Sequence, residues 1–247
     1  MIRQLLGYFS ICMCLAANAD ELTVVAGWDK PPYVITENHS GFELELVNTI
    51  LKELGHTMTP LYVPFGRSAR QLENGVADIV LTLRAEHLVP DSLLSDVYVA
   101  YQNSAVSLAS RNIVIEDATD LLPHTVLAFQ TARDVLGSEY QSAVSNHHCY
   151  SEIASQERQV KMLLLGSVDV AVMDRNIFTW LRSQLPAKFQ KDVVFHDLFE
   201  RSEYRAAILN TELRQQFNAQ LQRLKQDGRY QKLMNKYYLS YSTPSTD

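Results

Sequence analysis

The chain has 247 residues, with 22 Lys and Arg against 28 Asp and Glu, a formal net charge of −6 and a hydrophobic fraction of 47%. This length provides one large or two small domains with a sizeable core, and the composition excludes a disordered or low-complexity protein. An acidic balance without a run of Lys or Arg excludes the usual nucleic-acid-binding surface, because phosphate binding relies on clustered cations.

The first 19 residues have the pattern of a cleavable signal peptide. Arg3 is the one charge there, and the apolar run from residue 5 to residue 17 is too short to cross a bilayer about 30 Å thick. Ala17-Asn18-Ala19 then supplies the small residues that a signal peptidase recognises. The pattern predicts cleavage before Asp20 and export to the periplasm, with an uncleaved N-terminal anchor as the alternative.

Cleavage leaves one cysteine in the mature chain, Cys149, because Cys12 and Cys14 belong to the leader. We therefore expect no intramolecular disulfide. His147 and His148 precede Cys149 and raise the possibility of a metal site. Zinc needs three or four converging ligands, whereas adjacent side chains point in different directions, so we expect no metal and no cofactor.

Beyond the leader, short apolar strands alternate with amphipathic helices, which is typical of α/β layers. The predicted strands are Leu22–Ala26, Leu61–Val63, Ile79–Leu83, Ser104–Ala109, Thr125–Phe129, Val168–Met173, Val193–His196 and Ala206–Leu209. The predicted helices are Phe42–Leu54, Gly66–Asn74, Ala132–Val144, Gln156–Leu165, Asn176–Ser183, Thr211–Lys225 and Arg229–Tyr238. The polar tail 240–247 is expected to fray.

One helix–turn–strand motif occurs twice, about ninety residues apart. Gly75-Val76-Ala77-Asp78 and Gly166-Ser167-Val168-Asp169 each follow an amphipathic helix and lead into a buried strand. In both, the glycine can end the helix and the aspartate can hold the turn. The repeat predicts two lobes of similar construction.

Four segments carry a resemblance to a known family. They are Lys30-Pro31-Pro32-Tyr33, Gly41-Phe42-Glu43-Leu44-Glu45-Leu46, the D-V-A-V-M-D run from Asp169 to Asp174, and the terminal Asp227-Gly228-Arg229-Tyr230-Gln231-Lys232. Together with the two Gly-x-x-Asp turns, they resemble the extracellular solute-binding proteins of family 3 over residues 21–239. Members of that family are periplasmic receptors of polar amino-acid ABC transporters.

The resemblance implies an α/β fold with a bilobal, type II periplasmic-binding-protein clamshell. Lobe 1 would comprise residues 20–99 and 206–247, and lobe 2 would comprise residues 104–200. Segments 100–103 and 201–205 would form the hinge. The solute would bind in the cleft between the lobes, and closure around it would be a hinge motion.

The resemblance also implies residues that hold the two charged ends of an amino acid. Asp174 matches the family Asp that pairs with the ligand ammonium, although an Asp before a helix is also a favoured N-cap. Thr131 matches the turn where a hydroxyl and helix-start N–H groups bind the carboxylate, with capping again as the alternative. Thr82 matches a family hydroxyl contact, or else simply ends a buried strand.

The chain departs from the family at the cation that binds the carboxylate. His87 stands at the family's Arg position, after a retained Glu86, and histidine makes no bidentate guanidinium contact. Arg84 is the candidate replacement, with a surface salt bridge as its alternative. This departure leaves open a different anionic group, or a solute that is not an α-amino acid.

Aromatic side chains usually line such clefts. Phe65 matches the family's pocket aromatic, whereas Lys30 occupies the position of the aromatic before the prolines, and Trp28 is its candidate replacement. Tyr33 is a ligand candidate that could equally pack in the core. Arg67 is an additional cation expected either at the cleft mouth or in solvent.

The expected function is capture of a small polar solute, such as an amino acid, by a monomer that delivers it to an ABC permease. One alternative is a periplasmic enzyme on the same fold, similar to cyclohexadienyl dehydratases, because fold does not fix function. No nucleophile motif, H-E-x-x-H or phosphate loop accompanies that alternative. The other alternative is a sensory receptor, which would need a separate partner because no signalling domain follows residue 239.

Overall fold

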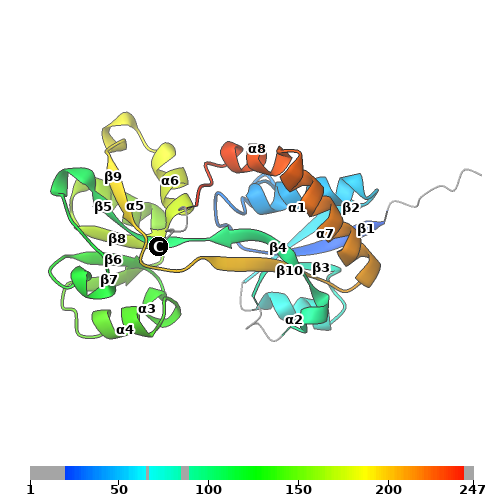
Figure 1. Ribbon diagram of the computed structural model, residues 1–247, viewed down its shortest axis with the longest axis horizontal. Helices are drawn as coiled ribbons and strands as arrows, with labels where there is room; N and C mark the ends of the chain where they lie inside the picture. The colour runs from blue at the N-terminus through cyan, green and yellow to red at the C-terminus, as the bar shows by residue number, and fades with distance from the viewer. Residues whose placement is uncertain (1–19, 65–66, 85–88, 242–247) are drawn as a thin grey trace, which may run out of the picture.

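The computed structural model describes residues 20–64, 67–84 and 89–241. The described strands form two five-stranded sheets, and Figure 1 shows them as two α/β lobes joined by the long strands β4 and β10. The α/β class and the bilobal architecture expected from the sequence are confirmed. The predicted signal peptide, Phe65, Glu86 and His87 lie outside the described residues.

Lobe 1 contains a mixed sheet with the strand order β2-β1-β3-β10-β4. β1 is parallel to β2 and β3, and β10 is antiparallel to both β3 and β4. The strands are β1 (Glu21–Gly27), β2 (Thr57–Val63), β3 (Ile79–Leu83), β4 (Leu94–Tyr101) and β10 (Ser202–Ile208).

Lobe 2 has the same kind of sheet, with the order β7-β6-β8-β5-β9. Here β6 is parallel to β7 and β8, and β5 is antiparallel to β8 and β9. The strands are β5 (Asn103–Leu108), β6 (Val126–Phe129), β7 (Tyr150–Ile153), β8 (Val170–Asp174) and β9 (Val193–His196).

Helices cover both faces of each sheet (Figure 1). In lobe 1, α1 (Phe42–Glu53), α7 (Thr211–Gln226) and α8 (Arg229–Lys236) lie on one face and α2 (Ser68–Glu73) on the other. In lobe 2, α5 (Gln156–Leu165) and α6 (Arg175–Ser183) lie opposite α3 (Ala132–Val135) and α4 (Ser138–Val144). Among the described residues, no helix is long and apolar enough to cross a membrane.

The alternation of side chains along β1 places apolar residues in two hydrophobic clusters, one on each face of the lobe 1 sheet. In β1, Val24 and Ala26 belong to the core beneath α1 and α7, whereas Val25 packs into a separate cluster with Leu72 of α2. Because successive side chains of a strand point to opposite faces, a fully apolar strand buries both faces at once. This is the physical reason that these strands read as continuous apolar runs.

The chain crosses between the lobes at two places. Gln102 alone separates β4 of lobe 1 from β5 of lobe 2, and β10 brings the chain back at Ser202. The hinge segments proposed from the sequence fall here, with residues 100–101 completing β4 and residues 202–205 opening β10. After α8, the chain returns toward lobe 2, where the Ser240 N–H donates to Asn176 Oδ1 at 2.9 Å.

The repeated Gly-x-x-Asp turn has the same geometry in both lobes. Gly75 and Gly166 adopt φ values of 67° and 80°, in the left-handed region where glycine carries no steric penalty. The Asp78 carboxylate accepts from the Thr23 N–H at 2.8 Å, and the Asp169 carboxylate accepts from the Thr125 N–H at 2.8 Å. Each aspartate therefore ties its turn to the start of the neighbouring strand.

The structure differs from the predicted elements at three places. The predicted helix Ala132–Val144 is two helices, because Gly137 adopts φ 97° and interrupts the helical backbone between α3 and α4. β4 and β7 were not predicted as strands. β7 is four residues long, lies at a sheet edge and is only partly buried, so its apolar pattern is weak.

Candidate functional site

Polar groups, among them the sequence-proposed Arg84, Thr131 and Asp174, lie at the carboxyl edges of the two parallel strand sets. β1 and β3 of lobe 1 lead to Lys30 and Arg84, and β6, β7 and β8 of lobe 2 end near Thr131, Glu152 and Asp174. Ligands of α/β proteins commonly bind outside the carboxyl ends of the strands. The candidate site is therefore the region where these two edges meet, beside the crossing strands.

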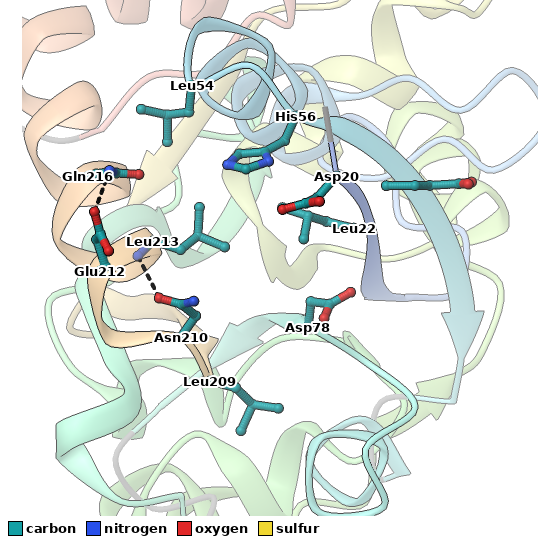
Figure 2. Close-up of a pocket in the computed structure, with 11 residues that line it drawn as sticks. Asp20, Leu22, Leu54, His56, Asp78, Leu209, Asn210, Glu212, Leu213 and Gln216 are labelled. Atoms are coloured by element: carbon teal, nitrogen blue, oxygen red, sulfur yellow. Dashed lines mark hydrogen bonds between the residues drawn. The ribbon is translucent and has the colours of Figure 1, made fainter. Parts of the chain in front are cut away.

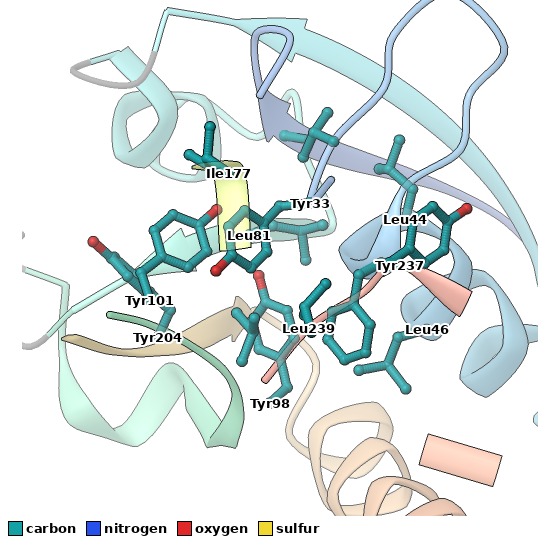
Figure 3. Close-up of a cluster of buried hydrophobic side chains, with 14 of the residues drawn as sticks. Tyr33, Leu44, Leu46, Leu81, Tyr98, Tyr101, Ile177, Tyr204, Tyr237 and Leu239 are labelled. Carbon is teal, nitrogen blue, oxygen red and sulfur yellow. The ribbon is translucent and has the colours of Figure 1, made fainter. Parts of the chain in front are cut away.

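Three tyrosines in ring contact, Tyr33, Tyr101 and Tyr204, lie in this region and are called the tyrosine stack below (Figure 3). The Tyr33 and Tyr101 ring centroids lie 3.9 Å apart with an interplanar angle of 29°, and the Tyr101 and Tyr204 centroids lie 4.7 Å apart with a tilt of 53°. Burial raises the pKa of all three phenols, so their hydroxyls stay protonated.

Asp174, the candidate ammonium partner, is a buried N-cap. Its Oδ1 accepts from the N–H groups of Asn176 and Ile177, both at 2.9 Å, which caps α6. Its Oδ2 accepts from the Gln102 N–H at 2.9 Å, and the Tyr33 hydroxyl donates to both oxygens at 3.2 Å. The capping alternative is thus observed, and the role in ligand binding stays a prediction.

The contact between Tyr33 and Asp174 joins the two lobes directly. Tyr33 belongs to the loop after β1, and its hydroxyl oxygen also accepts from the Asn176 side-chain amide at 3.0 Å. Burial raises the pKa of Asp174, although hydrogen bonds from Ile177 and Gln102 and the charge of Lys30 oppose that increase.

Glu43 is the second buried carboxylate of the region, and it lies at the start of α1. Its partners are hydroxyl groups: Thr82 Oγ1 donates at 2.8 Å, and the Tyr98 and Tyr101 hydroxyls donate as well. Thr82, another candidate contact, is 5% exposed and therefore serves this carboxylate. Its φ of 60° makes a bulge in β3 that turns its hydroxyl toward Glu43.

Lys30, the residue at the family's aromatic position, lies over the tyrosine stack. Its Nζ is 4.2 Å from the centroid of the Tyr101 ring, a cation–π geometry. Desolvation by the surrounding protein lowers the pKa of Lys30, and the charges of Asp174 and Glu43 oppose that decrease. The residue as a whole is nevertheless exposed.

Arg84, the candidate replacement for the family arginine, lies at the other end of the stack. Its guanidinium carbon is 5.9 Å from the centroid of the Tyr204 ring, and Nη1 donates to Ser202 Oγ at 3.2 Å. Lys30 and Arg84 therefore flank the same aromatic stack from lobe 1. Their place beside the crossing strands is compatible with binding an anion, which stays a prediction.

Thr131 opens α3 with a φ of 72°, and its side chain makes no capping bond. The helix-start donors of this turn are occupied by Glu152: Oε2 accepts from the Thr131 N–H at 2.8 Å and Oε1 accepts from the Arg133 N–H at 2.9 Å. Partial burial raises the pKa of Glu152. The two backbone bonds and a bond from the Tyr150 hydroxyl lower it by more, so the pKa of Glu152 lies below its ordinary value.

Two candidates lie at the solvent surface. Trp28 follows β1 and is 64% exposed, and Arg67 precedes α2 and is exposed. Both remain predictions as solute contacts.

The His147, His148 and Cys149 run forms a local turn. His147 Nε2 pairs with the Leu121 carbonyl at 3.0 Å, and Nδ1 accepts from the Cys149 N–H at 3.1 Å. Both ring nitrogens of His147 are thus engaged with the backbone. Within the described part of the chain, no cluster of three or more metal-binding side chains occurs.

A hollow of about 660 Å³ lies away from this region, at the opposite edge of the lobe 1 sheet (Figure 2). Its lining includes Asp20 before β1, Asp78 before β3 and Asn210 after β10. None of the candidate site residues lines it.

Sequence reasoning identified Lys30 only as a departure from the family and did not single out Glu43, Glu152, Tyr101 or Tyr204. Glu43 lies inside a family motif, where an acidic residue at a helix start predicts a cap instead of a hydroxyl-bound buried carboxylate. Nothing in the sequence indicates the tyrosine stack, because its members are separated by about seventy and one hundred residues.

Solved structures of amino-acid-binding proteins share this fold. An ancestral arginine-binding protein bound to arginine is 23% identical, has a TM-score of 0.63 and covers 89% of this chain and 98% of its own. The GluR0 ligand-binding core in complex with L-glutamate is 14% identical, with a TM-score of 0.66 and coverage of 90% and 99%. The ABC transporter substrate-binding protein AbpA from Streptococcus pneumoniae, bound to L-arginine, is 20% identical, with a TM-score of 0.61 and coverage of 88% and 94%.

No curated protein gives a significant sequence match. The description of bacterial extracellular solute-binding proteins, family 3, matches residues 22–240, which is most of the chain and contains both lobes. The motif order expected from the sequence and the two-sheet architecture agree with this match. The chain therefore belongs to the bacterial extracellular solute-binding proteins of family 3.

Proposed function

We propose that the mature chain is a periplasmic receptor that captures a small polar solute between its lobes and delivers it to an ABC permease. The observation that carries this proposal is the contact of Tyr33 with Asp174 and Asn176, which links the carboxyl edges of the two sheets. Charged groups of both lobes lie around this contact, so a solute bound there would touch both lobes. Hinge closure couples to binding when the solute contacts both lobes.

The proposed solute contacts are the candidates at the two edges. On lobe 1, Trp28 and Tyr33 would supply apolar contact, and Arg67, Thr82 and Arg84 would supply cations and a hydroxyl. On lobe 2, Thr131 and Asp174 are the contacts implied by the family.

Binding is tested by thermal-shift screening of amino acids, polyamines and small organic acids, followed by calorimetry. A solute at 100 times its Kd should add about 2.7 kcal/mol to the free energy of unfolding. The solved relatives hold arginine or L-glutamate, which supports including both compounds. Absence of binding by any class of small polar solute would overturn the receptor proposal.

Closure is tested by small-angle scattering with and without a solute that calorimetry has identified. The radius of gyration should decrease at saturation, because the lobes approach each other around the hinge. An unchanged radius at saturation would contradict closure but leave binding intact.

Receptor function also requires that the solute be released unchanged. NMR spectra of the solute recovered after prolonged incubation should be identical to those of the starting material. A new product that depends on the protein would favour the dehydratase-like alternative.

Export is tested by N-terminal sequencing of the periplasmic form, which should begin at Asp20. An intact Met1 in the membrane fraction would instead support an uncleaved anchor.

A further inference from the structure

We infer that the solute is a carboxylate without a neighbouring ammonium group, and that Lys30 binds its carboxylate. This inference rests on the proposed receptor function, narrows its substrate class and replaces Thr131 and Asp174 by Lys30 as the contact of the solute's charged group. It differs from the family-based expectation of an amino acid whose ammonium pairs with Asp174, and the two make opposite predictions for the same experiment.

Lys30 places a positive charge close to Asp174. Its ammonium lies 4.2 Å from the centroid of Tyr101, and Tyr101 stacks on Tyr33, whose hydroxyl contacts Asp174. A protein cation therefore lies near the residue that the resemblance assigns to a ligand ammonium. Among the residues that the structure describes, no carboxylate is within ion-pair distance of Lys30 Nζ. Its three N–H donors suit an anion.

The two buried carboxylates have little acceptor capacity left for a solute ammonium. A carboxylate has about four lone-pair sites, and Asp174 receives bonds from three backbone N–H groups and the Tyr33 hydroxyl. Glu43 receives bonds from three hydroxyl groups and is fully buried. A solute ammonium bound at Asp174 would have to displace one of its donors, whereas a solute anion bound at Lys30 needs no bond from either carboxylate.

The turn at Thr131, which the resemblance assigns to a ligand carboxylate, is already occupied. The Thr131 and Arg133 N–H groups donate to Glu152, and the Tyr150 hydroxyl donates to Glu152 Oε1 at 2.7 Å. A side chain of lobe 2 thus takes the donors of this turn. The anionic end of a solute would therefore bind on lobe 1, where Lys30 and Arg84 flank the tyrosine stack.

An α-amino acid fits this arrangement poorly for one geometric reason. Its ammonium group is attached to the carbon beside the carboxylate, so binding the carboxylate to Lys30 brings two ammonium groups close together. The same acid without the amine lacks this repulsion. The site should consequently distinguish acids that differ only in the amine.

The test compares matched pairs by calorimetry on the exported protein: succinate with L-aspartate, glutarate with L-glutamate, and 3-phenylpropionate with L-phenylalanine. At least one amine-free acid should bind at least about tenfold more tightly than the amino acid paired with it. The reason is that the amine-free acid has no ammonium group to repel the ammonium of Lys30. Tighter binding by the amino acids, or absence of binding by all three amine-free acids, would overturn the inference. Binding of amino acids alone would leave the receptor proposal standing.

A variant then assigns the cation. Lys30→Gln should weaken binding of the acid at least about tenfold, since the substitution removes the positive charge that contacts the carboxylate. Lys232→Gln, on the exposed face of α8, is the matched control and should leave the affinity unchanged. Circular dichroism of both variants should equal that of the wild type. Unchanged affinity in Lys30→Gln would refute the assignment even if amine-free acids bind.

Discussion

The two lobes each bury one carboxylate beside the proposed site, but they hold it in different ways. Glu43 of lobe 1 is bound by hydroxyl groups, whose hydrogen can rotate away so that the oxygen accepts instead. Asp174 of lobe 2 is bound mainly by backbone N–H groups, which can only donate. The comparison teaches that lobe 1 can adapt to a change of the buried group, whereas lobe 2 fixes the carboxylate as an acceptor.

A second pair of positions extends the comparison to the backbone. Gly41 precedes α1 of lobe 1 with φ 105° and ψ 159°, and Gly137 precedes α4 of lobe 2 with φ 97° and ψ 166°. A β-carbon at Gly41 would clash with the Tyr33 carbonyl oxygen, whereas at Gly137 nothing lies within 4 Å. The conformations match, and only the surroundings differ.

Substituting these glycines should give the largest effect. Gly41→Ala combines a strained backbone with a clash against backbone atoms, so we expect a loss of about 3–5 kcal/mol in the free energy of unfolding. Gly137→Ala carries only the conformational penalty, about 1–3 kcal/mol. Urea denaturation of both variants measures the difference. Equal losses would mean that the Tyr33 backbone moves aside readily.

Isosteric amides at the two carboxylates should give the next largest effect. Asp174→Asn places an NH₂ group against at least one N–H donor, which leaves a buried donor unsatisfied at about 1–3 kcal/mol. Glu43→Gln should lose about 1 kcal/mol or less, because its hydroxyl partners can reorient. Thermal unfolding monitored by circular dichroism ranks the pair. A larger loss in Glu43→Gln would reverse the comparison of the lobes.

Glu152 should give the smallest effect, and its effect should depend on pH. Glu152→Gln weakens the two partly exposed N–H contacts of the α3 turn, a loss of about 0.5 kcal/mol at neutral pH. Because folding lowers the pKa of Glu152, its contribution is full above the unfolded pKa of about 4.3. It disappears as the pH falls through the lower folded pKa. Urea titrations of wild type and variant from neutral to acid pH should converge, and a constant difference would contradict the assignment.

Much of the fold could be read from the sequence because it depends on local pattern. The Gly-x-x-Asp turns use side chains that bind the adjacent backbone, so they can be recognised as a short motif. The buried strands are apolar on both faces, so they can be recognised as short apolar runs. The split at Gly137 was missed because the apolar pattern of a helix continues across it. A glycine within such a pattern does not reveal whether its φ is positive.

The contacts of the candidate site were harder to predict from the sequence, because they join segments that are far apart along the chain. Lys30 reaches Tyr101 across the sheet of lobe 1, and Glu152 reaches the turn at Thr131 from the neighbouring parallel strand. The sequence does show that Lys30 replaces an aromatic residue. It does not show what lies beneath the ammonium, since that depends on tertiary packing.

Asn176 carries a consequence for every affinity measured on this protein. Its amide donates to Tyr33 and accepts from the Ser240 N–H, so one side chain of lobe 2 holds two segments of lobe 1. On the proposed hinge motion, these bonds would favour the lobe arrangement that contains them, and the apparent Kd would be the intrinsic Kd divided by the competent fraction. A substitution of Asn176 that spares the solute contacts would rescale the apparent affinity for all solutes by one common factor. The order of preference among solutes would then stay the same, and a changed order would place Asn176 against the solute itself.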